Sequence, residues 1–567
     1  MNKTTEELQQ EIDELKLQVA HLKSCKRYGL EWENKEEEFD HLTKNAFPIL
    51  TGKNDTSYPN ISVKDSNKKN PHILIEGDNY HSLSVLSYTH KGKIDVIYID
   101  PPYNTGNKSW KYNNDYVEKD DSYLHSKWLS MMNKRLLLAK ELLSPDGCLV
   151  CAIDENEMSN LDLLLKEMFS GYKVDHVVIV HNPRGVQGNN FSYVHEYALF
   201  VYPKGKKSYI GDVKRDEPLV EELRDHGGSS LRTDAKSCFY PFIVKGDKII
   251  GIGEVPPNDF HPSGKNVYRS NGSIEIYPID RNGTERKWVF ANNTVHKILS
   301  KLHVEKRNDG LFDIYRTKDM QKPRTVWSGK KYDASTWGSK VVKEITGVDF
   351  PYPKSIYTVF DAISILARDN KKSIVLDFFS GSGTTGHAVM DLNKEDGGNR
   401  QFILCTNNEN NICEEVTYER VKRVMQGYTT KKGKKIAGLG GELIYLKTDF
   451  VKKQNNETVT DEDKIKLTYE VGSVLALKEN TFNKVKESTY YQIFSSSKQL
   501  TGIYFNENKI DLSELVEYLA NQDKPCKLYL FSWTKGEYKH EFSEYENITT
   551  EDIPEPILDI YKSIGVI

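Results

Sequence analysis

Residues 94–106 read Ile-Asp-Val-Ile-Tyr-Ile-Asp-Pro-Pro-Tyr-Asn-Thr-Gly. The first six residues are rich in isoleucine and valine, a composition typical of a buried strand in a parallel sheet. The strand must end at Pro101 and Pro102, because proline cannot donate the hydrogen bonds of a sheet. Open α/β sheets bind ligands at the edge formed by the carboxyl ends of their strands. The turn after this strand is therefore a candidate binding or catalytic site.

The residue types in this turn suit methyl transfer to the exocyclic amine of adenine. That amine is a poor nucleophile, because its lone pair is delocalised into the ring. Asp100 and the carbonyl of Pro101 can each accept one amine hydrogen, which leaves the lone pair free to attack an electrophilic methyl group. Tyr103 can stack on a base that has been extruded from the duplex. A proline-rich turn with an incidental acid is the alternative interpretation, and these residues alone do not decide between the two.

Composition places the 567-residue chain among soluble globular proteins of about three or four domains. Hydrophobic residues make up 38% of the chain and charged residues 28%, which allows a sizeable core. No apolar run approaches a membrane span and the charged N-terminus does not look like a signal peptide, so we expect a cytoplasmic protein. The seven cysteines are scattered, and Cys148 and Cys151 lie in an apolar stretch that predicts a core strand, not a zinc or redox site.

Charge is unevenly distributed along the chain. The net charge is −4, yet residues 204–344 contain 27 Lys and Arg against 19 Asp and Glu, which gives +8. A basic segment in an otherwise acidic chain predicts an electrostatic footprint for DNA phosphates. A merely solvated basic face is the alternative.

Alternating strands and helices predict a doubly wound α/β unit that an inserted domain interrupts. The pattern breaks after Pro203, where turn residues separate short β-like pieces, and it resumes before the strand at 373–379. The predicted parts are an N-terminal amphipathic or coiled-coil helix (1–28), an N-terminal extension (29–71), the first half of the α/β unit (72–202), the insert (203–347), the second half (348–445) and a small C-terminal α+β domain (446–567).

The N-terminal helix carries a short heptad pattern. Leu8, Ile12, Leu15, Val19 and Leu22 follow the 4-3-4-3 spacing of a coiled coil. The pattern predicts self-association or the docking of a partner. Because two heptads are short, a lone amphipathic helix that packs on its own domain is the alternative.

A second candidate site follows the strand at 373–379, where residues 380–386 read Ser-Gly-Ser-Gly-Thr-Thr-Gly. Glycines let a ligand approach the backbone closely, and the N–H groups that open the next helix can face it. Glu409, just past the following strand, is the type of acid that binds ribose hydroxyls. Taken alone, this turn also fits the dinucleotide site of an oxidoreductase, or a turn required only for packing. A methyl-acceptor turn in the same sheet favours methyl transfer, because a dehydrogenase has no evident need for it.

The order of these features resembles the beta class of DNA amino-methyltransferases, and most closely the modification (Mod) subunits of type III restriction–modification systems. Asp-Pro-Pro-Tyr-Asn-Thr-Gly at 100–106 precedes a variable insert, which precedes Asp-x-Phe-x-Gly-x-Gly-Thr-Thr at 377–385. The resemblance covers residues 72–428. Tyr28-Gly29-Leu30, Trp32-Glu33 and Arg135-Leu136 are also similar to that family.

This resemblance implies a Rossmann-like methyltransferase sheet with a circularly permuted motif order, and an insert that acts as the target-recognition domain. It implies that the target adenine is held by Asp100, Pro101, Pro102 and Tyr103. It implies that S-adenosylmethionine is bound by Asp78, Asp377, Phe379, Ser380, Gly381, Gly383, Thr384 and Glu409. Aspartate at position 100 favours adenine, since cytosine-amine enzymes usually begin that motif with serine. Pro353-Lys354 resembles the family's segment before the cofactor motif, but that segment more often ends Lys-Pro and here Ser355 follows Lys354, so no role is assigned to Lys354.

The resemblance also implies the partners. We expect double-stranded DNA as the substrate, a homodimer, a restriction (Res) nuclease-helicase subunit as a partner, and no membrane. A solitary adenine methyltransferase without a nuclease partner is one alternative, and a nicotinamide-dependent oxidoreductase is another. A methyltransferase-like specificity module that no longer transfers methyl groups is disfavoured, because both half-sites look intact.

Overall fold

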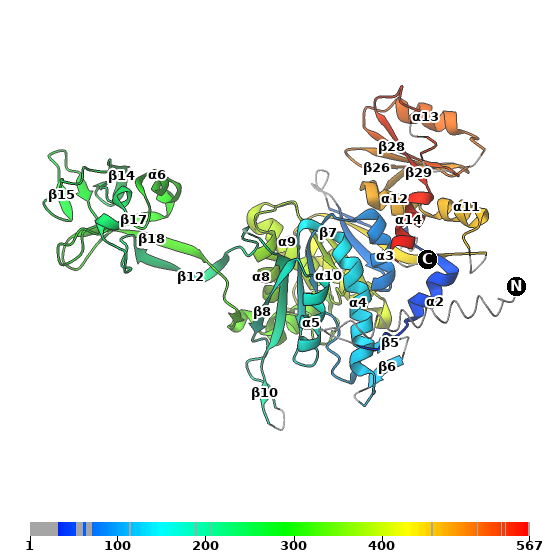
Figure 1. The fold of residues 1–567 in the computed structure, drawn as a ribbon, viewed down its shortest axis with the longest axis horizontal. Helices are drawn as coiled ribbons and strands as arrows, with labels where there is room; N and C mark the ends of the chain where they lie inside the picture. Colours follow the sequence, from blue (N-terminus) through cyan, green and yellow to red (C-terminus); the bar gives the residue numbers. More distant parts are fainter. Residues whose placement is uncertain are drawn as a thin grey trace, which may run out of the picture. The chain divides into compact units, whose positions relative to one another are not determined.

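The computed structural model describes residues 32–52, 60–63, 71–112, 115–118, 120–187, 190–205, 207–454, 458–506, 508–533, 536–538 and 540–564. These residues form two compact units (Figure 1). The larger unit belongs to Met1–Ile210 and Arg324–Ile567, and the smaller one is Gly211–Pro323. The heptads predicted near the N-terminus and the string Tyr28-Gly29-Leu30 lie outside the described residues.

The larger unit is built on a mixed sheet of eleven strands in the order β1-β24-β3-β21-β20-β4-β7-β11-β8-β19, with β2 paired to β24. The strands are β1 (Ala46–Gly52), β2 (Ile61–Ser62), β3 (His72–Glu76), β4 (Ile94–Ile99), β7 (Leu143–Ile153), β8 (Tyr172–Ile179), β11 (Glu196–Pro203), β19 (Val326–Trp327), β20 (Ile374–Asp377), β21 (Gln401–Thr406) and β24 (Glu442–Lys452). The six strands from β24 to β7 are parallel, whereas β11 is antiparallel to both of its neighbours.

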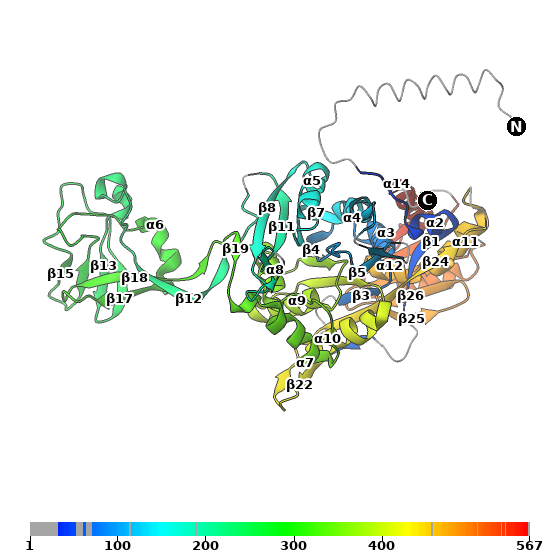
Figure 2. The same cartoon turned by 90° about the horizontal axis from the view of Figure 1, so that it is seen from below.

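Helices cover both faces of this sheet (Figure 2). One layer contains α3 (Asn79–Thr89), α4 (Leu124–Leu142) and α5 (Met158–Met168), and the other contains α7 (Lys340–Thr346), α8 (Ile356–Ala367), α9 (Thr384–Asp396) and α10 (Glu419–Gln426). The helix α2 (Glu38–Asn45) precedes β1, and the two-stranded ribbons are β5 (Asn107–Tyr112) with β6 (Asp115–Glu118), β9 (Val186–Gln187) with β10 (Ser192–Tyr193), and β22 (Gly427–Thr429) with β23 (Lys435–Ala437). The predicted doubly wound, Rossmann-like α/β fold is confirmed.

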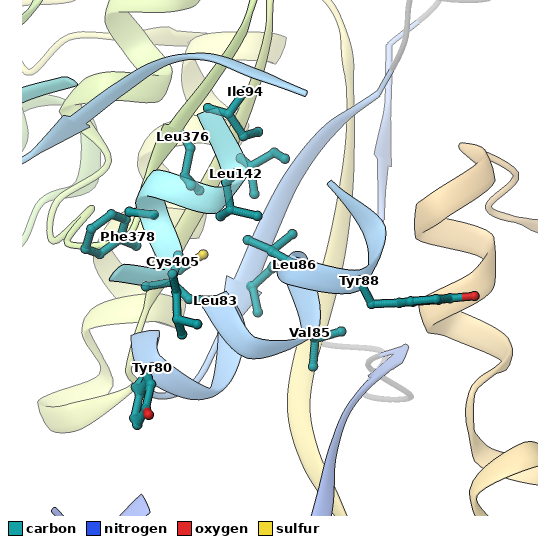
Figure 3. Close-up of a cluster of buried hydrophobic side chains, with 14 of the residues drawn as sticks. Tyr80, Leu83, Val85, Leu86, Tyr88, Ile94, Leu142, Leu376, Phe378 and Cys405 are labelled. Carbon is teal, nitrogen blue, oxygen red and sulfur yellow. The ribbon is translucent and has the colours of Figure 1, made fainter. Parts of the chain in front are cut away.

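The helix α3 lies in the centre of the core (Figure 3). Every residue from Tyr80 to Thr89 is buried, as expected for a helix that is covered on all sides. Leu83 and Leu86 pack with side chains from neighbouring strands and from α4. At the other end of the helix, Tyr88 accepts a 3.1 Å hydrogen bond from Lys478 of the C-terminal region. The helix α3 therefore contacts both the main sheet and the C-terminal region.

The C-terminal region contains both strands and helices. Its five strands pair in the order β25 (Asn483–Glu487), β26 (Tyr491–Ser495), β27 (Leu500–Tyr504), β28 (Cys526–Phe531) and β29 (Ile548–Ile553). Its helices are α11 (Asp461–Glu470), α12 (Gly472–Glu479), α13 (Leu512–Ala520) and α14 (Glu555–Ser563). The expected boundary at 445/446 falls inside β24, whose later residues pair with β1 in the main sheet. The extension at 29–71 likewise supplies β1 and β2 to that sheet.

The smaller unit contains two antiparallel sheets of its own. One has the order β12 (Val213–Glu222), β18 (Phe312–Gln321), β17 (Leu302–Lys306), and the other β14 (Lys248–Ile252), β13 (Phe242–Lys245), β16 (Ile274–Ile276), β15 (Asn266–Tyr268). The short helix α6 (Asn292–Val295) completes the unit, and Trp288 is fully buried in its core. The unit is narrower than the predicted insert at 203–347, because β19 pairs with β8 and α7 packs against α10.

The inserted unit at 211–323 carries less net positive charge than the longer segment at 204–344. Residues 211–323 contain 19 Lys and Arg against 17 Asp and Glu, a net charge of only +2. Most of the +8 found for residues 204–344 therefore belongs to the flanking segments, which are part of the larger unit. The basic segment at 204–344 thus includes the inserted unit and parts of the larger unit on either side of it in the chain.

Two further expectations concern cysteines and membranes. Cys148 and Cys151 are buried free cysteines of β7, as the apolar stretch predicted. In the part of the chain that the structure describes, no group of three or more His, Cys, Asp or Glu is placed to hold a metal ion. Every helix in that part is too short or too polar to cross a membrane.

Candidate active site

The two predicted half-sites meet because β4 and β20 are neighbours. Val375 pairs with Val96 in parallel register, and Leu376 pairs with Ile97. Asp100 follows β4 and Asp377 ends β20, so both acids lie at the carboxyl edge of the sheet. The strand order reverses here, since the chain continues from β4 to β7 on one side and from β20 to β21 on the other. Such a switch point is where open α/β sheets bind ligands.

Asp100 is held by a lysine to which the sequence assigned no role. The Nζ atom of Lys354 lies 2.9 Å from Oδ2 of Asp100. The other carboxylate oxygen, Oδ1, is buried and accepts no hydrogen bond from any described residue. Burial raises the pKa of Asp100, the charge of Lys354 opposes this rise, and the charge of Glu196 adds to it. One oxygen is thus fixed by an ammonium group, and the other can accept a hydrogen bond from a substrate.

The turn after Asp100 is anchored by α4. Trp128 donates a 2.7 Å hydrogen bond from Nε1 to the carbonyl of Pro102. Asn104 adopts a left-handed backbone with φ 60°, and its side chain donates to the carbonyl of Leu124 at 3.2 Å and to Glu157. Pro101 and Asn104 are buried, and these hydrogen bonds fix the conformation of the turn at the end of β4.

Tyr103 is fixed at both its ring and its hydroxyl group. The ring packs against the main hydrophobic core, and the Nζ atom of Lys354 lies 4.6 Å from its centroid. The hydroxyl donates a 3.0 Å hydrogen bond to Oε2 of Glu196, the first residue of β11. Glu196 is only 3% exposed, and sequence reasoning missed it because no motif surrounds it.

Asp377 organises the glycine turn. Its Oδ1 atom accepts a hydrogen bond from the backbone N–H of Phe379 at 3.0 Å, and its Oδ2 atom accepts one from Oγ1 of Thr385 at 2.5 Å. Burial raises the pKa of Asp377 to about 7, against the effect of these hydrogen bonds, and the charge of Asp100 contributes to the rise. The two acids are therefore within electrostatic reach of each other.

The glycines of this turn have backbones that other residues rarely adopt. Gly381 has φ 45° and Gly383 has φ 73°, both in the left-handed region. A Cβ atom at Gly381 would lie 3.4 Å from the ring of Phe350, and one at Gly383 would lie 3.2 Å from the methyl group of Thr417. Backbone conformation favours glycine at both positions, and close packing against Thr417 adds to this preference at Gly383.

A buried arginine braces the same turn from α10. Arg420 is fully buried, and its Nη1 atom donates to the carbonyl and the hydroxyl of Ser382, both at 3.1 Å, and to Oγ1 of Thr384 at 2.8 Å. Thr417 also donates a hydrogen bond to the carbonyl of Gly381. Burial lowers the pKa of Arg420 to about 10, so it remains charged at neutral pH. Nothing in its local sequence indicated this role.

The remaining predicted residues also lie at this edge of the sheet. Asp78 caps α3 by accepting a 2.7 Å hydrogen bond from the N–H of Tyr80. Its neighbour Asn79 donates to the carbonyl of Phe378 at 3.0 Å, which connects the turn after β3 with the turn after β20. Glu409 follows β21, the strand between those two, and is partly exposed. Ser380 is 6% exposed, and its buried Oγ atom has no hydrogen-bond partner among the described residues.

Arg135 connects Asp78 with the N-terminal part of the larger unit. Its Nη1 atom lies 2.9 Å from both carboxylate oxygens of Glu37, and its Nη2 atom lies 3.6 Å from Oδ2 of Asp78. Arg135 also donates to the side chain of Asn79. The arginine thereby supports the turn after β3, a contact that sequence reasoning did not identify.

The fold and these two turns are those of an α/β enzyme with a candidate ligand site at a switch point of its sheet. The chain belongs to the DNA methylase family, because its residues 94–419, more than half of its length, match the family model of that description. This family uses S-adenosylmethionine as its methyl donor. The predicted DNA methyltransferase activity is confirmed, and family membership removes the oxidoreductase alternative.

Individual relatives agree with this assignment. The type II methyltransferase M.KpnI of Klebsiella pneumoniae is 29% identical over 69% of this chain and 93% of its own length. The type III restriction-modification enzyme EcoPI Mod subunit of Escherichia phage P1 is 28% identical over 76% of this chain and 73% of its own length. The predicted resemblance to type III Mod subunits is therefore confirmed. The crystal structure of the M1.HpyAVI-SAM complex matches 62% of this chain and 97% of its own at 15% identity, with a TM-score of 0.29, too low to support an argument.

Proposed function

We propose that this protein methylates the N6 amine of adenine in double-stranded DNA, as the modification and specificity subunit of a type III restriction–modification system. One observation carries the proposal. Asp100 and the glycine turn at 380–386 follow adjacent parallel strands, so a methyl donor bound at one would lie beside a base bound at the other.

The residues of the glycine turn fit the methyl donor. Gly381 and Gly383 leave the backbone open to close approach, and α9 begins directly after them with free N–H groups at its first turn. The buried Oγ atom of Ser380 is available to a ligand. We assign the cofactor site to Asp78, Asp377, Phe379, Ser380, Gly381, Gly383, Thr384 and Glu409. When bound there, S-adenosylmethionine supplies an electrophilic methyl group on its sulfonium sulfur.

The base site would hold the amine for attack. Oδ1 of Asp100 accepts one amine hydrogen, and the Pro101 carbonyl accepts the other. Tyr103 stacks on the flipped base, which must leave the duplex because its amine is otherwise paired. The hydrogen bond to Asp100 becomes stronger as the nitrogen gains positive charge, so it favours the transition state over the ground state. An aspartate at this position suits adenine, whereas the family covers both N6-adenine and N4-cytosine methylation.

Product analysis tests the choice of base. Plasmid DNA from cells that express the protein is digested to nucleosides and analysed by mass spectrometry, with an Asp100→Ala strain as the control. We expect N6-methyladenine only in the strain with the wild-type protein. N4-methylcytosine in its place would contradict the proposal for adenine while leaving the family assignment intact.

The type III assignment is supported by similarity to the EcoPI Mod subunit, and a partner experiment tests it. Affinity capture of the tagged protein from its host, followed by mass spectrometry, should recover a nuclease-helicase subunit, and light scattering should give the mass of a homodimer. A solitary methyltransferase is the second candidate, favoured by the match to 93% of M.KpnI. Capture of no nuclease together with normal methylation would support that candidate.

A further inference from the structure

We propose that Glu196 and Lys354 form a positioning pair for methyl transfer, in which Lys354 orients Asp100 and Glu196 orients both Lys354 and Tyr103. This inference rests on the proposed function of the base site and adds two residues to it. The pair is formed by segments that are distant in sequence, the start of β11 and the segment before α8. Asp100 and Tyr103 come from a third segment, the turn after β4.

The geometry joins the four side chains in a closed network. The ammonium group of Lys354 lies 2.9 Å from Oδ2 of Asp100 and 3.2 Å from Oε2 of Glu196. The same Oε2 atom accepts the hydroxyl proton of Tyr103 at 3.0 Å. Lys354 is 11% exposed and Glu196 is 3% exposed at the side chain. A displacement of either residue would therefore move both groups that are proposed to hold the base.

The charges of the network suit the reaction. With both carboxyl groups ionised, Asp100, Glu196 and Lys354 carry one net negative charge. Methyl transfer makes the acceptor nitrogen positive, so a preorganised negative charge beside it stabilises the transition state. The charge of Lys354 lowers the pKa of the buried Asp100 against the effect of burial, which favours the ionised form that accepts a hydrogen bond. A buried ion pair is often no better for stability than a well-packed apolar pair of the same volume. The role of Glu196 and Lys354 in the reaction is therefore tested, and not their contribution to stability.

Several other titratable groups face this network. They are Tyr98, Tyr103, Cys151 and Asp377 around Asp100, and Asp154 and His181 near Lys354 and Glu196. Burial raises the pKa values of Tyr98, Tyr103 and Cys151 well above their usual ranges, so these groups stay neutral near pH 7. Burial raises the pKa of Asp154 to about 6 and that of Asp377 to about 7, while the charge of Lys354 lowers the pKa of Asp154 and the charge of Asp100 adds to the rise at Asp377.

The test compares pH profiles of single-turnover methylation for Lys354→Met and Glu196→Gln, with DNA and S-adenosylmethionine saturating. Removing the lysine charge raises the pKa of Asp100, so the acid limb should move to higher pH. Removing the glutamate charge lowers the pKa of Asp100, so the acid limb should move to lower pH. Both plateau rates should fall by about tenfold or more, the effect of losing a charge-assisted hydrogen bond. Cofactor affinity measured by calorimetry should change little.

The chain offers a matched control in Lys478→Met. Lys478 lies 2.6 Å from Glu551 and 4.4 Å from the ring centroid of Tyr88, which repeats the lysine–carboxylate–tyrosine arrangement outside the site. This variant should lose thermal stability but keep the wild-type rate and pH profile. Lys354→Arg and Glu196→Asp, which retain the charges, should recover part of the rate and provide soluble protein if the first variants do not fold.

Opposite shifts of the two acid limbs would support the positioning pair, because a purely structural role would not move them in opposite directions. Wild-type rates in both variants, or equal shifts in the same direction, would overturn it. The result is independent of the base identity. An enzyme that forms N4-methylcytosine would disprove the proposed function, yet its pH profiles would still decide the role of Glu196 and Lys354.

Discussion

Asp100 and Asp377 end up at one edge of one sheet, after adjacent parallel strands, although they belong to distant parts of the sequence. The charge of Asp100 also contributes, after burial, to the raised pKa of Asp377. The inserted residues 211–323 are a separate compact unit between these half-sites in the chain. The two half-sites thus lie on adjacent strands of one sheet, although the inserted unit separates them in the sequence.

The first prediction concerns the pH dependence of stability. The pKa of Asp377 is about 7 in the folded protein, raised by burial from an ordinary value of 3.8. Between these values the folded state holds a proton that the unfolded state has released, so the free energy of unfolding falls as pH rises through this window. Asp377→Asn lacks the titrating carboxyl group, so its thermal midpoint should rise relative to that of the wild type from pH 4 to pH 8. A difference in midpoint that stays constant over this range would contradict the prediction.

The second prediction concerns Asp100. Asp100→Ala should slow single-turnover methylation by about tenfold to a hundredfold, since one charge-assisted hydrogen bond is worth about 1.5–3 kcal/mol. Asp100→Asn can still accept one hydrogen bond and should lie between alanine and wild type. Rapid-quench assays with saturating DNA and cofactor measure the step, and binding titrations of the same variants serve as controls. A wild-type rate in the alanine variant would remove Asp100 from the mechanism.

The third prediction separates an effect specific to the glycine turn from the backbone strain that alanine causes at any positive φ. Gly381→Ala, Gly383→Ala and Gly397→Ala all place a side chain at positive φ, which costs roughly 1–2 kcal/mol in stability at each position. A Cβ at Gly397 would meet nothing within 4 Å, and this residue follows the far end of α9. Calorimetry should therefore show loss of S-adenosylmethionine affinity in the first two variants only. Equal affinity in all three would argue against this turn as the cofactor site.

The sequence predicted the two half-sites because each is a short string directly after an apolar strand. Glu196, Lys354 and Arg420 could not be assigned in this way, because each acts on a strand or turn far away in the chain. Only the folded sheet shows which carboxylate or carbonyl each of them reaches. Lys354 had no assigned role because Ser355 follows it where the family more often has proline, and the contact of Lys354 with Asp100 now indicates one.

Domain boundaries were harder to predict for similar reasons. Strand β24 continues across the expected boundary at 445/446. Its first half pairs with β3 and its second half with β1, so both halves belong to the main sheet. The strand β25 (Asn483–Glu487) is polar and mostly exposed, so no hydrophobic pattern marks it. The basic insert was located by composition alone, and composition cannot tell a domain from the flanking segments that fold elsewhere.

The fourth prediction follows from the corrected charge distribution. Lys330 and Lys340 are exposed and belong to the positively charged segment after the insert. Lys330→Ala and Lys340→Ala together should weaken DNA binding for all sequences alike and reduce the salt dependence of log K by about one for each phosphate that is no longer neutralised. Exchange of residues 211–323 for those of a relative should instead change the methylated sequence with little effect on this slope. The reverse outcome would assign the phosphate-binding residues to the insert.

The last prediction divides the role of Tyr103 between its ring and its hydroxyl group. The ring is proposed to stack on the flipped base, and such stacking is worth about 1–3 kcal/mol per base. The hydroxyl instead donates to Glu196 at 3.0 Å and holds the ring in place. Tyr103→Ala should therefore weaken binding of target DNA by about tenfold or more, whereas Tyr103→Phe should leave affinity nearly unchanged and lower the methylation rate.

A mismatched target distinguishes stacking from a general loss of structure at Tyr103. A mismatch makes the base easier to extrude, because less pairing and stacking must be broken. DNA with a mismatch opposite the target adenine should therefore restore part of the affinity of Tyr103→Ala and should have little effect on Tyr103→Phe. The measurements are fluorescence titrations with matched and mismatched duplexes, beside thermal midpoints of both variants. Equal weakening on both duplexes would mean that Tyr103 supports the turn after β4 and does not grip the base.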